Sequence, residues 1–175
     1  ISKLENTVWG LSFNFQKTAM QNKNFRLAVA SCFDRSRYQE LLSKNLTVAD
    51  RVIPPGVSLD GEPYHELTAG LTGIPYNEEA AQEYYAAALN ELGVNKLDLT
   101  VIMAESDQVN HETYFSYISQ LIQKLDLFCT IEVLPQKDYE ERIASGDYDM
   151  AVIPVKAEYN HPLSVLDAFS SGGSQ

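Results

Sequence analysis

The sequence predicts an α/β fold in which an open, mostly parallel sheet is flanked by helices. Three observations predict it. Strand-like and helix-like patterns alternate between residues 77 and 155. The connections between the strand-like stretches are long enough for the right-handed crossovers that join parallel strands. The last strand-like stretch, residues 148–155, is almost continuously apolar, which is typical of a strand covered on both faces.

The first part of the chain is less regular. Residues 7–15 read as another strand, and helical periodicity runs from residue 25 to about residue 45. Residues 53–76 are rich in proline and glycine and show no sustained periodicity, so we predict an irregular surface excursion there.

The clearest helix covers residues 78–92. Asn77 can cap its first turn, which carries acidic residues that suit the helix dipole, and Gly93 can end it in the left-handed conformation. One face of this helix is apolar at helical spacing and should point inward. Its members are Ala81, Tyr84, Tyr85, Ala88 and Leu92.

Two strands and two helices follow. Residues 97–103 and 129–134 are rich in β-branched and apolar residues, as strands are. Between them a helix begins near Asn110, and after them a short helix begins near Asp138 and ends at Gly146. The longer helix should bury one apolar stripe, which consists of Phe115, Ile118, Leu121, Ile122 and Leu125.

Composition limits the class of protein. Of the 175 residues, 45% are hydrophobic and 21% charged, as in ordinary folded domains, and the formal net charge of -11 disfavours nucleic acid as a partner. No apolar run is long enough to span a bilayer. Cys32 and Cys129 are either two separate buried thiols or one disulfide.

Domain boundaries follow from the same patterns. We predict a single α/β lobe over residues 1–169, followed by a tail or linker at 170–175. The chain starts with a structured pattern already running, so we expect that it was excised from a longer protein.

Signatures of catalysis are missing from the sequence. The nucleotide-binding patterns GxGxxG and GxxxxGK[ST] and the GxSxG pattern of α/β hydrolases do not occur. The histidines His65, His111 and His161 lie far apart and match no metal-binding spacing. We therefore expect a protein that is not an enzyme and that has no catalytic residues, no metal and no cofactor.

The segment after the last strand is a candidate binding site. Ligands of open α/β sheets bind outside the carboxyl ends of the strands. There the sequence places Val155 at the end of the strand, followed in the loop by Lys156, Glu158, Tyr159 and Asn160. A polar loop that merely ends a strand is the alternative.

Three segments, in order, resemble a known family. Residues 146–173, "GDYDMAVIPVKAEYNHPLSVLDAFSSGG", are similar to a strand, an Ala-Asp-Tyr-x-x-Pro loop and a helix of bacterial extracellular solute-binding proteins of family 5, the peptide/nickel type. Residues 13–38, "FNFQKTAMQNKNFRLAVASCFDRSRY", resemble the family's strand ending in Asn and its Arg-x-Ala helix. Residues 74–94, "IPYNEEAAQEYYAAALNELGV", resemble its Tyr-Asn/Asp-x-Glu-x-Ala helix.

The resemblance implies one lobe of a periplasmic-binding-protein-like fold, type II, peptide type, and the lobe nearer the C-terminus of the full protein. It implies a substrate-binding component of an ABC importer, which closes with a second lobe on a peptide or other small solute and delivers it to a membrane permease. The protein would be extracytoplasmic, either periplasmic or lipid-anchored at the cell surface. In peptide binders of this family the loop acid holds the ligand's α-ammonium, and Glu158 stands at that position.

The sequence departs from the family pattern at two positions. The family often has Asp where this chain has Glu158, and Trp where it has Val155. The ligand therefore stays open among oligopeptides, dipeptides, nickel chelates and sugars. Two other classes also stay open. A doubly wound α/β enzyme domain would show an acid or base with a strongly shifted pKa in a closed cleft. An interaction domain would expose an apolar patch around residues 53–74.

Overall fold

The computed structural model describes residues 7–42, 48–49, 51–70, 73–106 and 109–166. The chain divides into two compact units. Unit 1 comprises Ile1–Gly10, Ala49–Gly73 and Ile153–Gln175, and unit 2 comprises Leu11–Val48 and Ile74–Val152. The single lobe over residues 1–169 stays a prediction, and the predicted tail at 170–175 lies outside the described residues.

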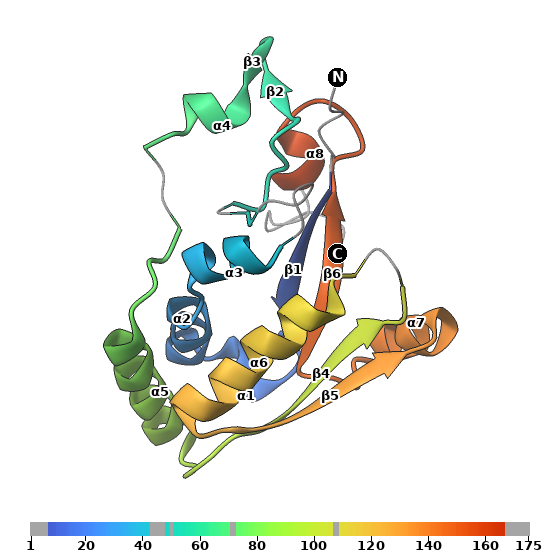
Figure 1. Cartoon of the computed structure of the whole chain (residues 1–175). Coiled ribbons are helices and arrows are strands. Elements are labelled where there is room, and N and C mark those ends of the chain that lie inside the picture. Colours follow the sequence, from blue (N-terminus) through green and yellow to red (C-terminus); the bar gives the residue numbers. More distant parts are fainter. Residues whose placement is uncertain (1–6, 43–47, 50, 71–72, 107–108, 167–175) are drawn as a thin grey trace. The chain divides into compact units, whose positions relative to one another are not determined.

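Four strands pair into one sheet in the order β1-β6-β4-β5 (Figure 1). Strand β4 (Asp98–Ala104) pairs in parallel with β5 (Phe128–Leu134) along its whole length and with β6 (Met150–Lys156). Strand β1 (Thr7–Phe13) is antiparallel to its neighbour β6. This direction follows from a hydrogen bond between the end of β1 and the start of β6, in which Asn14 N donates to Asp149 O (2.9 Å). The predicted open, mostly parallel sheet with flanking helices is confirmed.

Strand β6 is covered on both faces only at its beginning. Met150, Ala151 and Val152 are buried, but from Ile153 onward half-buried and exposed residues alternate. The interpretation of residues 148–155 as a strand buried on both faces is therefore wrong for its second half. An apolar run does not by itself report cover on both faces, because Val and Ile also suit a strand that is covered on one face.

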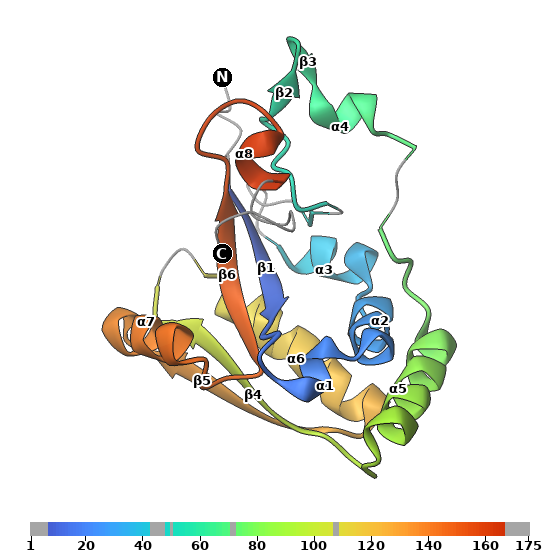
Figure 2. The same cartoon turned by 180° about the vertical axis from the view of Figure 1, so that it is seen from behind.

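The two long helices form where their caps predicted. Helix α5 (Glu78–Leu92) begins with the Asn77 side chain accepting from Ala80 N (2.9 Å) and ends at Gly93 with φ +68°. Helix α6 (His111–Leu125) begins with the Asn110 side chain accepting from Thr113 N (3.2 Å). Helix α2 (Lys23–Ser31) packs against α5, and α5 also packs against α6 (Figure 2).

One residue of the predicted apolar stripe on α6 faces outward. Phe115 is 39% exposed, whereas Tyr117 is buried together with Ile118, Leu121 and Leu125. Tyr117 can be buried because its hydroxyl has a partner there, donating to Val29 O at 2.6 Å. Periodicity alone did not distinguish the two aromatic positions.

Other helix boundaries differ from the prediction. The helical stretch from residue 25 is interrupted, because α2 ends at Ser31 and Asp34 caps a new helix, α3 (Arg35–Leu41), by accepting from Ser36 N and Arg37 N. Hydrogen bonding from the Ser36 side chain lowers the pKa of Asp34. The predicted end near residue 45 lies outside the described residues. Helix α1 (Thr18–Gln21) was not predicted, and α7 (Gln136–Ser145) begins earlier than expected, directly after Pro135.

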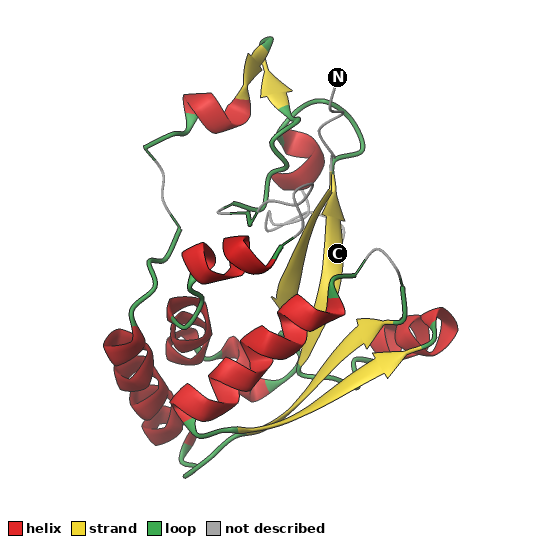
Figure 3. Cartoon of the chain, viewed as in Figure 1, coloured by secondary structure: helices red, strands yellow, loops and turns green. Residues whose placement is uncertain are grey.

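The excursion over residues 53–76 is more regular than predicted. It contains an antiparallel hairpin of β2 (Ser58–Leu59) and β3 (Glu62–Pro63), followed by helix α4 (Tyr64–Leu67), as Figure 3 shows. The turn residues Asp60 and Gly61 both have positive φ, +52° and +88°. An Asp-Gly pair in this conformation is a strong signal for a two-residue hairpin, and the sequence prediction overlooked it.

Both cysteines are free thiols. Cys32 is buried and Cys129 is half-buried, and burial raises the pKa of each thiol to about 11. Of the two alternatives, separate thiols are therefore confirmed, although Cys129 is less buried than expected.

Gly146 and Gly93 should respond alike to substitution by alanine. Both end helices in the left-handed conformation (φ +70° and +68°), which costs a residue with a side chain about 1–2 kcal/mol. A Cβ at Gly93 meets nothing within 4 Å, and a Cβ at Gly146 comes close only to the end of the exposed Gln16 side chain, which can move aside. Urea denaturation should therefore show a loss of unfolding free energy of about 1–2 kcal/mol for each of Gly146→Ala and Gly93→Ala. A much larger loss for Gly146→Ala would show that the Gln16 side chain cannot move.

Candidate functional site

The predicted binding loop follows the carboxyl end of β6 and belongs to unit 1. It joins β6 to the short helix α8 (Leu163–Leu166). Val155 and Lys156 are the last residues of the strand, and Glu158, Tyr159 and Asn160 lie in the loop. All five predicted ligand-binding residues therefore come together in one short segment.

A small hydrophobic core holds both ends of this loop. Ala157 and Val165 are buried together with Ile53 and Val57 from the excursion. Val155 and Tyr64 pack against this cluster as half-buried side chains. The side chain of Val155 thus contributes to the base of the loop. Because Ile53 and Val57 are buried in the core of unit 1, they are not available for the exposed apolar patch that an interaction domain would need around residues 53–74.

The tip of the loop is exposed. Glu158, Tyr159 and Asn160 are all solvent-exposed, and 56% of Tyr159 is accessible. With the described part of the chain, the Glu158 carboxylate forms neither an ion pair nor a hydrogen bond. A carboxylate that keeps its lone pairs free next to an exposed aromatic ring can accept hydrogen bonds from a cationic group of a ligand.

Asn160 differs from its neighbours because its amide is already engaged. Its Oδ1 accepts from Ser58 N at 2.7 Å, and its Nδ2 donates to Ser58 Oγ at 2.8 Å. The loop is thereby joined to the β2–β3 hairpin. Ser58 was not predicted as part of the site, since no local signal in the sequence pairs two residues so far apart in the chain.

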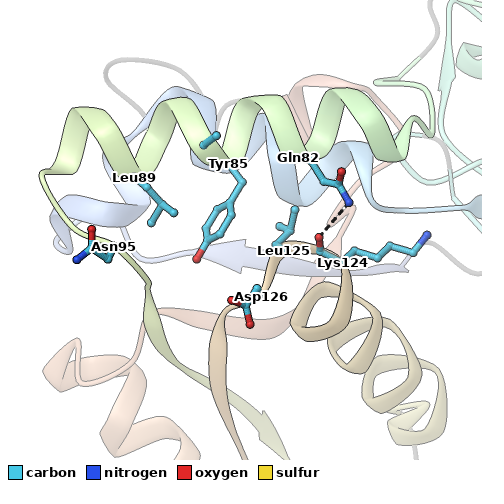
Figure 4. A pocket seen from close by; sticks show the side chains of 8 residues that line it. Gln82, Tyr85, Leu89, Asn95, Lys124, Leu125 and Asp126 are labelled. Carbon is cyan, nitrogen blue, oxygen red and sulfur yellow. Dashed lines mark hydrogen bonds between the residues drawn. The ribbon is translucent and has the colours of Figure 1, made fainter.

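Two hollows are lined by residues of unit 2. One, of about 250 Å³, lies between α5 and the end of α6, where Gln82 donates to Lys124 O (Figure 4). The other lies directly after β4 and is lined by Glu105, Ser106, Val109 and His111. Neither of the two is lined by any of the five predicted residues.

Shifted pKa values in unit 2 have ordinary causes. Burial raises the pKa of Tyr114 and of Tyr139 to about 12, and a hydrogen bond from Lys124 lowers the pKa of Glu78. Within the described ranges, no three His, Cys, Asp or Glu side chains gather as metal ligands do. Every helix in the described part of the chain is too short or too polar to cross a membrane.

Comparison with known proteins places the chain in a family. A family model described as "Bacterial extracellular solute-binding proteins, family 5 Middle" matches residues 1–175. A dipeptide-binding protein of Lactococcus lactis subsp. cremoris is 24% identical over 158 residues, which cover 89% of this chain and 28% of that protein.

Solved structures agree on the fold. Listeria monocytogenes OppA bound to peptide superimposes with a TM-score of 0.83 at 26% identity, covering 97% of this chain and 35% of that one. The substrate-binding domain of an oligopeptide ABC transporter from Bacillus anthracis gives a TM-score of 0.83 at 20% identity, with 97% and 34% covered. The chain thus spans about a third of the length of these relatives.

These relatives are substrate-binding proteins, and none of them supports the alternative of an enzyme domain or a separate interaction domain. The chain belongs to the bacterial extracellular solute-binding proteins of family 5.

Proposed function

We propose that this chain forms a ligand-gripping lobe of the substrate-binding component of an ABC importer that carries peptides. The observation that carries the proposal is the carboxylate of Glu158, exposed at the tip of the loop after β6 and unpaired among the described residues. In this role Glu158 accepts the α-ammonium of the peptide, while Tyr159 and Lys156 flank it. The dipeptide-binding relative and the peptide-bound OppA support peptides as the ligand class.

The rest of the receptor completes the site in this proposal. A charge-assisted hydrogen bond contributes about 1.5–3 kcal/mol, whereas a dissociation constant near 1 μM requires about 8 kcal/mol. Backbone pairing with an extended peptide and burial against a second lobe supply the remainder. The closed receptor then docks on a membrane permease. It works outside the cytoplasm, either in the periplasm or anchored by a lipid at the cell surface.

The proposal is tested by blocking the ammonium of the ligand. Calorimetry on the intact receptor that contains this chain should show tri-alanine binding at least about 10-fold more tightly than N-acetyl-tri-alanine, because acetylation removes the charge-assisted contact. Free acetate and acetamide serve as controls for the added group. Equal affinity for the two peptides would contradict ammonium recognition, and binding of neither by folded receptor would contradict peptide as the ligand.

A further inference from the structure

We propose that Asn160 is a positioning residue, which fixes the tip of the loop through Ser58 and thereby holds Glu158 and Tyr159 in place for the ligand. This inference rests on the proposed function of Glu158. It assigns Asn160 a different role from that of a direct ligand contact, because its side-chain amide already serves a partner within unit 1.

The geometry of the hairpin explains why Ser58 is available. Ser58 pairs with Pro63 across the hairpin, and the next residues along, Val57 and Tyr64, share the ladder hydrogen bond from Tyr64 N to Val57 O (3.0 Å). Hydrogen-bonded and non-hydrogen-bonded pairs alternate in an antiparallel ladder, so the N–H of Ser58 points away from β3. Asn160 Oδ1 accepts this outward N–H.

Both polar functions of the Asn160 amide meet the same residue. Besides the bond to Ser58 N, the Nδ2 group donates to Ser58 Oγ, so two hydrogen bonds of 2.7 and 2.8 Å fix the position and the rotation of the side chain. A paired contact of this kind restrains direction as well as distance. We refer to it as the Asn160–Ser58 pair.

The loop needs such a restraint at its tip. Its ends are held by burial, since Ala157 is 4% and Val165 2% exposed. The tip has no comparable burial, and the bond from His161 N to Tyr159 O (2.8 Å) only shapes a local turn. The Asn160–Ser58 pair links this turn to the hairpin. The hairpin itself is tied to the small core through Val57 and Tyr64.

Fixing the tip in advance should strengthen binding without any contact from Asn160 to the ligand. A loop that is ordered before binding loses less conformational entropy when the ligand arrives. Loss of the pair should therefore weaken peptide binding by about 5- to 10-fold, through the ordering of Glu158 and Tyr159. This weakening should occur only when residue 158 carries a carboxylate that can accept the ligand's ammonium.

The experiment is a set of variants in the intact receptor, titrated with tri-alanine. We expect Asn160→Ala to weaken binding by about 5- to 10-fold and Ser58→Ala, which removes one of the two bonds, by about 2- to 3-fold. Ser58→Thr keeps the hydroxyl and should bind like the wild type. In a Glu158→Gln background, Asn160→Ala should change affinity by less than about 2-fold, because coupled residues are not additive.

Hydrogen exchange tests the pair without ligand. Asn160→Ala should accelerate exchange in the segment 57–63, whereas Ser58→Thr should not. Unchanged exchange would overturn the pair itself. A full Asn160→Ala effect in the Glu158→Gln background would overturn the positioning role in favour of a direct ligand contact. If Glu158→Gln binds like the wild type while exchange still accelerates, the proposed role of Glu158 fails and the positioning role fails with it, although the pair exists.

Discussion

Asn14→Asp should destabilise the protein by about 3–5 kcal/mol at neutral pH, although the two side chains have nearly the same shape. Asn14 is 5% exposed and donates through Nδ2 to Gly146 O (2.9 Å) and Tyr148 O (2.8 Å). Its Oδ1 accepts from Gln16 N (3.0 Å). A carboxylate at this place can still accept from Gln16, but it would turn a negative oxygen toward two carbonyl oxygens.

The loss should grow as the pH rises. A buried carboxyl group that faces carbonyl oxygens has a raised pKa in the folded state, because only its protonated form can donate there. The variant is therefore least destabilised below the unfolded carboxyl pKa of about 3.9. Above that value it loses stability relative to the wild type by up to about 1.4 kcal/mol per pH unit, until the raised folded pKa is passed.

Two controls separate charge from lost hydrogen bonds. Asn14→Ala leaves the buried carbonyl of Gly146 and the half-buried carbonyl of Tyr148 without their donor but introduces no charge, so it should cost about 1–3 kcal/mol and show no added pH dependence. Asn95→Asp makes the same chemical change at an exposed position and should stay within about 0.5 kcal/mol of the wild type. Urea denaturation at several pH values measures all three. A pH-independent loss for Asn14→Asp would contradict this account.

The local signals in the sequence predicted those parts of the fold that local interactions determine. Asn77 and Asn110 cap their helices through backbone amides within the next three residues, and Gly93 and Gly146 end helices in a conformation that glycine adopts easily. Such contacts lie within one helical turn. The parallel sheet followed from the order and spacing of these elements.

Features that depend on distant partners were predicted less well. Tyr117 is buried and its hydroxyl donates to the carbonyl of Val29 in α2, whereas Phe115 is exposed. The sequence of α6 alone does not contain the position of that carbonyl. The engagement of Asn160 by Ser58 is of the same kind. The hairpin at Asp60 and Gly61 is different, since its turn signal was present in the sequence and was overlooked among the surrounding prolines and glycines.

Glu158→Gln should weaken binding of tri-alanine to the intact receptor by about 10- to 100-fold, the equivalent of about 1.5–3 kcal/mol for a charge-assisted hydrogen bond. Glutamine keeps the shape of the side chain but replaces one acceptor oxygen with a donor and removes the charge. Glu83→Gln makes the same change at an exposed position of α5 and should leave affinity unchanged.

The ligand supplies the other half of the test. With N-acetyl-tri-alanine, whose ammonium is absent, Glu158→Gln should have almost no further effect, because the interaction it removes no longer exists. Glu158→Asp keeps the charge one methylene further back and should stay within a few-fold of the wild type, since a carboxylate that can pair with the ammonium is retained. An equal loss for both peptides would show that Glu158 supports the loop rather than the ligand. A loss confined to the free peptide is the result that only a direct contact between this carboxylate and the ammonium produces.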